Sequence, residues 1–174
     1  MNQVIQALTQ RRSCKSFDGR QVDNAALEQI LAAGTNAASG MGRQSPKIVV
    51  LQNPAEIAEL EQMNAAVMGK SGIHPFYGAP TVCVVLADAD IPTCVEDGAL
   101  VIGNMMNAAW SLGIGSCWIH RAREEFASPA GQELLRDWGI TGNYIGIGHC
   151  VLGYPAKAYA DPAPRKADYV LLRP

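Results

Sequence analysis

The pattern of apolar and polar positions divides the chain into alternating strands and helices. Continuous apolar runs of a few residues are typical of buried strands, and apolar residues three or four positions apart are typical of helices. We predict strands at residues 47–52, 81–87, 115–120 and 144–155. We predict helices at residues 2–12, 23–34, 53–68, 93–112 and 128–138. Short loops join these elements and no linker is apparent, so we expect one domain over residues 1–174, an α+β or α/β sandwich with one central sheet.

The longest helical stretch, residues 93–112, differs from the others because it is apolar on more than one face. Such a helix is expected to be buried. Gly98, Gly103 and several alanines lie in it, and small residues let another backbone approach closely.

Composition narrows the class of protein. Apolar residues make up 48% of the chain and charged residues 17%, which is typical of a globular protein. Composition alone leaves open whether a second copy covers part of its surface. The net charge of −2 gives no basic face for nucleic acid. No apolar run reaches the roughly 18 residues that span a bilayer, and the N-terminal charges follow the apolar stretch, unlike those of a signal peptide. We expect a cytoplasmic protein.

The five cysteines do not have the spacing of a metal site or a redox motif. We expect free thiols in a reducing compartment and no metal. No HExxH or GxSxG motif accompanies the histidines. We interpret His149 as a core residue, and Glu124 and Glu125 as charges on a helix surface.

Two basic clusters lie near opposite ends of the chain. Arg11, Arg12 and Lys15 surround Ser13, and Arg165 is followed by Lys166. Arginine binds phosphate through paired hydrogen bonds and lysine adds a point charge. The alternative for the first cluster is a favourable charge at a helix C-terminus, and for the second it is an ordinary solvated surface. The two form one site only if the fold brings them together.

Two glycine-containing segments could lie against a flat ligand. Residues 39–44 read SGMGRQ and residues 113–120 read GIGSCWIH. Glycine permits close backbone approach. Neither segment is a GxGxxG after a strand and there is no Walker A motif, so a Rossmann dinucleotide site or a P-loop is not expected.

The motifs RRSCKSF, FYGAPTV, DGALVIGNMMNAAWSLGIGSCWI, LGYP and APRK follow one another in an order that resembles the nitroreductase family of small flavin-dependent oxidoreductases. The resemblance covers nearly the whole chain. It implies a three-layer α-β-α sandwich with a mostly antiparallel sheet, in an intertwined homodimer. It also implies two FMN molecules at the dimer interface, each touched by both chains, and a dimer core formed by the long helix with Gly98, Gly103 and Met105.

The resemblance also implies roles for particular residues. Arg11 and Ser13 would bind the FMN phosphate and ribityl chain, with Arg12 beside them and with Arg165 and Lys166 at the phosphate. Lys15 would reach N1 and O2 of the flavin, where a fixed cation stabilises the reduced anionic ring. Backbone along the ring would come from Cys117, Trp118 and Ile119. The other edge would be covered by Ser39, Gly40, Met41, Gly42 and Gln44.

The implied reaction is ping-pong: NADH or NADPH passes a hydride to flavin N5, leaves, and is replaced by a nitroaromatic, quinone or enone acceptor. No catalytic side chain is implied. Our candidates for the substrate pocket are Phe76, Tyr77 and His74, and ordinary packing of the two aromatics remains an alternative.

The chain departs from the family at two points. Where the family often has Asn-x-Gln-Pro-Trp, this chain has Gly42, Arg43, Gln44, Ser45 and Pro46, and His120 stands where other members carry an acid. These changes bear on the choice of acceptor and on flavin potential. Other functions stay open: a flavin-storing or flavin-processing protein with little turnover, a flavin enzyme that dehydrogenates a peptide or metabolite, and a thiol redox sensor built on Cys14 or Cys117.

Overall fold

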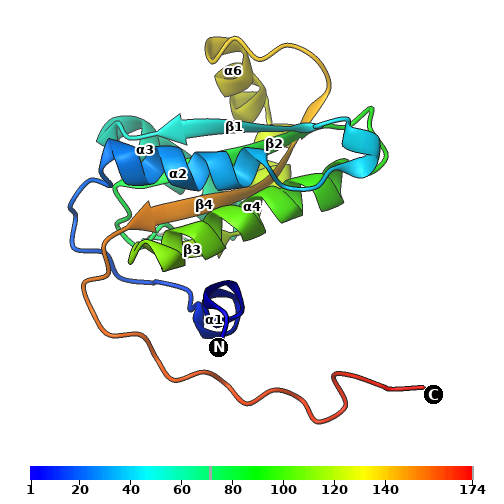
Figure 1. Ribbon diagram of the computed structural model, residues 1–174. Helices are drawn as coiled ribbons and strands as arrows, with labels where there is room; N and C mark the ends of the chain where they lie inside the picture. The colour runs from blue at the N-terminus through cyan, green and yellow to red at the C-terminus, as the bar shows by residue number, and fades with distance from the viewer. Residues whose placement is uncertain (71, 174) are drawn as a thin grey trace.

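The computed structural model describes residues 1–70 and 72–173 (Figure 1). The predicted loop at residues 70–80 includes Ser71, which lies outside the described residues. The strands are β1 (Pro46–Leu51), β2 (Thr81–Asp88), β3 (Gly115–Ile119) and β4 (Tyr144–Gly153). The helices are α1 (Gln3–Gln10), α2 (Asn24–Thr35), the short 3-10 turn η1 (Gly40–Gly42), α3 (Pro54–Val67), α4 (Cys94–Ser111), α5 (Ala122–Ala127) and α6 (Pro129–Asp137).

The strands form one sheet in the order β1-β2-β4-β3, and each neighbouring pair is antiparallel. Pro46 and Ala87 pair at one end of the sheet, and Gly115 and Gly153 pair at the other. An isolated bridge from Ser13 to Ser116 attaches the segment after α1 to the outer edge of β3. The prediction of a central antiparallel sheet is confirmed.

Strand β2 shows how the sequence builds two cores on one sheet. Cys83, Val85 and Ala87 face α2 and α4, whereas Val82, Val84 and Leu86 face α3, α5 and α6. Because side chains alternate along a strand, a strand covered on both faces reads as an unbroken apolar run. Figure 1 shows the helices on either side of the sheet. The predicted three-layer arrangement is confirmed.

The helices begin and end where capping groups act. Asn2 accepts a hydrogen bond from the Val4 N–H at 2.9 Å, and Asp23 accepts one from the Ala26 N–H at 2.9 Å. The first helix ends at Gln10, two residues earlier than we predicted, because Arg11 is already extended and leads the chain to β3. Helix α5 was missed by the sequence analysis: it has only six residues, which is too short for a clear apolar period.

One face of the long helix α4 is buried within its own chain, whereas Leu100 on the same helix is exposed, and the predicted dimer core at this helix stays a prediction. Met105 is fully buried, and a Cβ on Gly34 of α2 would meet its side chain. A Cβ on Gly98 would meet Ile147 of β4, whereas one on Gly103 would meet open space. Met105 and Gly98 therefore serve helix and sheet packing in one chain. Within the described ranges, no helix combines the length and the apolar character needed to cross a membrane.

Candidate cofactor-binding site

Members of both basic clusters line one hollow of about 1010 Å³, between the end of α1 and the extended segment near the C-terminus. Its cations are Arg11, Arg12, Lys15 and Arg165. Among the described residues, Asp161 is the one carboxylate in the lining, so the hollow keeps a clear excess of positive charge. The fold thus brings residues of the two basic clusters together, which the sequence alone could not show. An anion is the ligand that this surface favours.

Arg11 is the cation best prepared for a ligand. Its Nη1 is buried and has no hydrogen-bond partner among the described residues. The other arginines use backbone carbonyls: Arg12 donates to Thr9 and Arg11 at 3.1 and 2.9 Å, and Arg165 donates to Ala163 at 2.9 Å. A buried guanidinium nitrogen without an acceptor is costly. A phosphate oxygen would satisfy it, so the residues present fit the phosphate group of FMN.

The segment that carries Ser13 and Lys15 is fixed to the sheet. The Cys14 N–H donates to the Ser116 carbonyl at 2.8 Å, and a second bridge joins Phe17 to Pro155. These bonds hold the hydroxyl of Ser13 and the charges of Arg11 and Lys15 near Cys117.

The thiols beside this hollow are poor nucleophiles. Burial raises the pKa of Cys117, although the Ser13 hydroxyl and the Lys15 and Arg11 charges oppose that rise. Burial also raises the pKa of Cys14. Because the thiolate is the reactive form, this environment does not favour the thiol-sensor alternative.

A second hollow, of about 510 Å³, lies at the other end of β3 and gathers several predicted residues. Its lining comprises Met68, Lys70, Ile73, His74, Pro75, Tyr77, Trp118, Ile119, His120 and Arg121. Tyr77 and Arg121 have left-handed backbones, with φ of 57° and 83°. Such strain in residues other than glycine tends to cluster at ligand sites.

Phe76 is not a wall of this hollow, contrary to our prediction. It is 1% exposed and packs against the buried ring of His149. Its neighbour Tyr77 does line the hollow. The alternation of the chain sends one aromatic inward and the next outward, so ordinary core packing accounts for Phe76.

The position of Arg121 depends on Asn64, which the sequence analysis missed. Asn64 is fully buried on α3, and its Oδ1 accepts from Nε and Nη2 of Arg121 at 3.1 and 3.0 Å. Its Nδ2 donates to the His120 carbonyl at 2.8 Å. One amide thereby fixes the turn that follows β3. Nothing in the sequence marks this asparagine, which sits inside an ordinary helical pattern.

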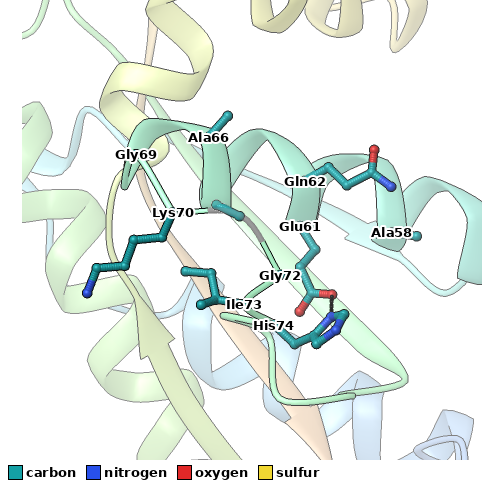
Figure 2. A pocket seen from close by; sticks show the side chains of 10 residues that line it. Ala58, Glu61, Gln62, Ala66, Gly69, Lys70, Gly72, Ile73 and His74 are labelled. Atoms are coloured by element: carbon teal, nitrogen blue, oxygen red, sulfur yellow. Dashed lines mark hydrogen bonds and ion pairs between the residues drawn. The ribbon is translucent and has the colours of Figure 1, made fainter.

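A third hollow, of about 630 Å³, adjoins the second and is lined by α3 and residues near His74 (Figure 2). Glu61 reaches across it. One carboxylate oxygen accepts the Phe76 N–H at 2.8 Å, and the other lies 3.1 Å from Nδ1 of His74. Figure 2 shows the Lys70 side chain extending away from this pair.

The loop at residues 39–44 lies far from the Arg11 hollow in the same chain. It precedes Pro46, at the end of the sheet opposite Ser13 and Gly115 (Figure 1). Ser39 and Gln44 line a separate hollow of about 220 Å³, and Met41 is 87% exposed. Within one chain the structure therefore does not bring Ser39, Gly40, Met41, Gly42 and Gln44 to the residues predicted at the flavin phosphate.

Asp97 of α4 holds this loop in place. Its carboxylate accepts the Gly40 N–H at 2.9 Å, the Ser45 hydroxyl at 2.7 Å and the Thr93 hydroxyl at 3.2 Å. Burial raises the pKa of Asp97, but these three donors outweigh it and lower the pKa overall. A Cβ at Gly40 would collide with Thr93, so only glycine fits there.

Other expectations from the sequence concern charged residues and a histidine outside these hollows. Glu125 is not a surface charge: it is 1% exposed and bonds to Nε2 of His149, which is the core residue we predicted. Its neighbour Glu124 is exposed, as predicted. Lys166 does not line the Arg11 hollow, and its role at the phosphate stays a prediction.

The arrangement has the parts of a flavoprotein: an anion-binding hollow, a sheet edge beside it, and a mixed aromatic and cationic hollow at the far end of that edge. The described residues contain no cluster of side chains suited to a metal ion. The profile of the Nitroreductase family matches residues 8–154. The chain belongs to the nitroreductase family.

Individual relatives agree with this assignment. A solved nitroreductase with bound FMN from Bacteroides fragilis is 28% identical, with a TM-score of 0.90 over 99% of this chain and 100% of that one. The Archaeoglobus fulgidus protein "Putative NADH dehydrogenase/NAD(P)H nitroreductase" is 29% identical over 157 residues, 89% of this chain and 87% of its own. The Bacillus subtilis protein "FMN reductase [NAD(P)H]" is 25% identical over 181 residues, 90% of this chain and 67% of its own.

Proposed function

We propose that the protein is an FMN-dependent oxidoreductase that uses NADH or NADPH to reduce nitroaromatic, quinone or enone acceptors. The observation that carries the proposal is the Arg11 hollow, which four cations from two ends of the chain line, and in which the buried Nη1 of Arg11 has no partner among the described residues. The FMN bound to the Bacteroides fragilis relative supports the identity of the anion.

The chain's own residues then have distinct tasks. Arg11 and Arg165 would hold the phosphate, and Ser13 would add a hydroxyl donor. Lys15, four residues beyond Arg11, would hold a positive charge at the flavin ring. When bound, FMN supplies the two-electron transfer between reductant and acceptor. No side chain has to act as a nucleophile, in keeping with the raised pKa values of Cys14 and Cys117.

We propose further that the site is completed by a second copy of the chain. Residues 39–44 and the Arg11 hollow lie at opposite ends of one sheet, so the loop predicted to cover the flavin would come from the other protomer. Exposed apolar side chains at both ends of the chain would be covered in such a dimer: Val4, Ile5, Leu8, Tyr169, Val170, Leu171 and Leu172. The five free cysteines agree with the predicted reducing cytoplasm.

The first test is the visible spectrum of the purified protein, with the released cofactor identified. We expect flavin bands and one FMN per chain, and NAD(P)H-dependent turnover of a nitroaromatic. The variants Arg11→Ala and Lys15→Ala should retain much less FMN than Glu124→Ala. Glu124 is the control because it is exposed and is not among the residues that line the hollow.

Two results would count against this assignment. A colourless protein that fails to take up added FMN would exclude the oxidoreductase. Full FMN occupancy without turnover would replace it with the flavin-storage alternative.

A further inference from the structure

We propose that the 510 Å³ hollow at the end of β3 binds the anionic group of the acceptor, and that Lys70 and Arg121 are the residues that contact this group. The substrate class would be planar acceptors that carry a carboxylate, such as a nitrobenzoate or a quinone carboxylate. This inference rests on the proposed function and names the acceptor for it.

The charge of the hollow carries the argument. Its lining contains the permanent cations Lys70 and Arg121 together with His74 and His120, and the described residues contribute no aspartate or glutamate to it. The chain as a whole has a net charge of −2, so this local excess does not reflect its average composition. A carboxylate entering the hollow would meet two uncompensated positive charges.

Glu61, a carboxylate in the lining of the adjoining 630 Å³ hollow, is already engaged. Both oxygens of Glu61 are taken, one by the Phe76 N–H and one by His74. Figure 2 shows Lys70 pointing away from that carboxylate. Over residues 1–70 and 72–173, neither Lys70 nor Arg121 takes part in an ion pair.

Arg121 is held in place by a neutral group, so its charge stays available. Nε and Nη2 both donate to Oδ1 of Asn64, and Nη1 has no hydrogen-bond partner in the part of the chain that the structure describes. Asn64 also fixes the preceding carbonyl, at His120. A left-handed residue held by a buried amide costs conformational energy, and such strain is kept where it positions a side chain for use.

The remaining walls suit a flat ligand body. Trp118 and Tyr77 line the same hollow as the two cations. Aromatic side chains offer flat apolar surfaces on which a planar ring can stack. A planar ring with a carboxylate at one edge therefore matches both parts of the lining.

Binding of non-reducible analogues tests the inference without turnover. Isothermal titration of the FMN-loaded protein would compare benzoate with benzamide, which has the same shape and no charge. We expect benzoate to bind at least about tenfold more tightly, because hydrogen bonds between charged groups are stronger than neutral ones. Equal affinities would overturn the proposal.

Substitutions test whether Lys70 and Arg121 are the residues that bind the carboxylate of benzoate. Lys70→Gln and Arg121→Gln should each reduce the preference for benzoate by about tenfold. Arg123→Gln, an exposed arginine on α5, is the matched control and should leave it unchanged. Lys70 is exposed, so its variant should fold even if loss of the Asn64 contact impairs Arg121→Gln. An unchanged preference in Lys70→Gln would overturn the assignment.

Kinetics with NADH, 4-nitrobenzoate and 4-nitrobenzamide separate this inference from the proposed function. We expect Lys70→Gln to raise KM for the nitrobenzoate alone. Turnover of both acceptors without charge preference would overturn the inference and leave the oxidoreductase intact. A benzoate preference without turnover of either acceptor would overturn the oxidoreductase, and the acceptor assignment would fail with it, leaving only an anion-binding hollow. If Lys70→Gln raised KM for NADPH but not for the nitrobenzoate, the anion read here would be the phosphate of the reductant, and the acceptor assignment would fail.

Discussion

Two polar clusters at opposite ends of the sheet, one around the buried Asp97 and one around the half-buried Arg11, differ in one respect. Around Asp97, three donors meet one carboxylate and every hydrogen bond closes within the chain. Around Arg11, four cations gather and a buried nitrogen lacks an acceptor among the described residues. Buried polar groups in proteins are normally satisfied. The comparison suggests that the Asp97 cluster serves the fold and that the Arg11 cluster serves a ligand.

The largest expected effect comes from removing the carboxylate at the centre of the Asp97 cluster. Asp97→Ala would leave the Gly40 N–H and two hydroxyls without their acceptor, and should lower the free energy of unfolding by about 3 kcal/mol. Urea unfolding would measure it, with Glu96→Ala as the exposed neighbouring control. Because the loop that Asp97 holds is proposed to cover the flavin of the other protomer, the loss should be at least as large with FMN as without it. A loss of under about 0.5 kcal/mol, the size typical of surface changes, would contradict the structural role of this carboxylate.

The unsatisfied cluster should behave in the opposite way. Arg11→Met removes a half-buried charge whose buried Nη1 has no partner among the described residues, so the stability of the FMN-free protein should change by less than about 1 kcal/mol. FMN affinity should fall about 10- to 100-fold, because a charge-assisted pair is lost. Thermal unfolding over an FMN titration would show both results, with Arg123→Met as control. A large loss of stability without FMN would make Arg11 structural and erase the contrast.

The smallest expected effect is a pH dependence of the free energy of unfolding that comes from the Asp97 carboxyl. The pKa of this carboxyl is lowered in the fold, so its contribution to stability is complete above the ordinary carboxyl pKa of about 3.9. It is lost as the pH falls through the lower folded value. The stability gap between wild type and Asp97→Asn should therefore narrow as the pH falls below about 4. Urea titrations from pH 6 to pH 2.5 would test this, and a constant gap would contradict it.

Sequence reasoning recovered the elements whose patterns are local. The apolar run of β2 and the caps at Asn2 and Asp23 act over a few residues, so spacing alone predicts them. Helix α5 failed because six residues carry too little periodicity. Within it, Glu124 and Glu125 differ by one position and so by about 100° around the helix, enough to send one outward and bury the other. Composition does not show which of the two glutamates is buried.

The candidate site shows the same limit over longer distances. The Arg11 cluster was recognisable because its charges are adjacent in sequence, but its union with Arg165 required the fold. Asn64 and Arg121 are 57 positions apart, and neither stands out in its own segment. Phe76 and Tyr77 were predicted together, yet neighbouring residues can face opposite ways. Contacts between distant elements are what single-sequence patterns do not encode.

The bridge between Ser13 and Ser116 also bears on how the protein resists aggregation. Strand β3 lies at the border of the sheet, and an open border readily recruits strands from other chains. The segment after α1 occupies part of that border through Ser13 and the Cys14 N–H. A protease that cuts between α1 and α2 would release this cover together with Arg11 and Lys15. Bleaching of the protein and turbidity of its solution should then develop together.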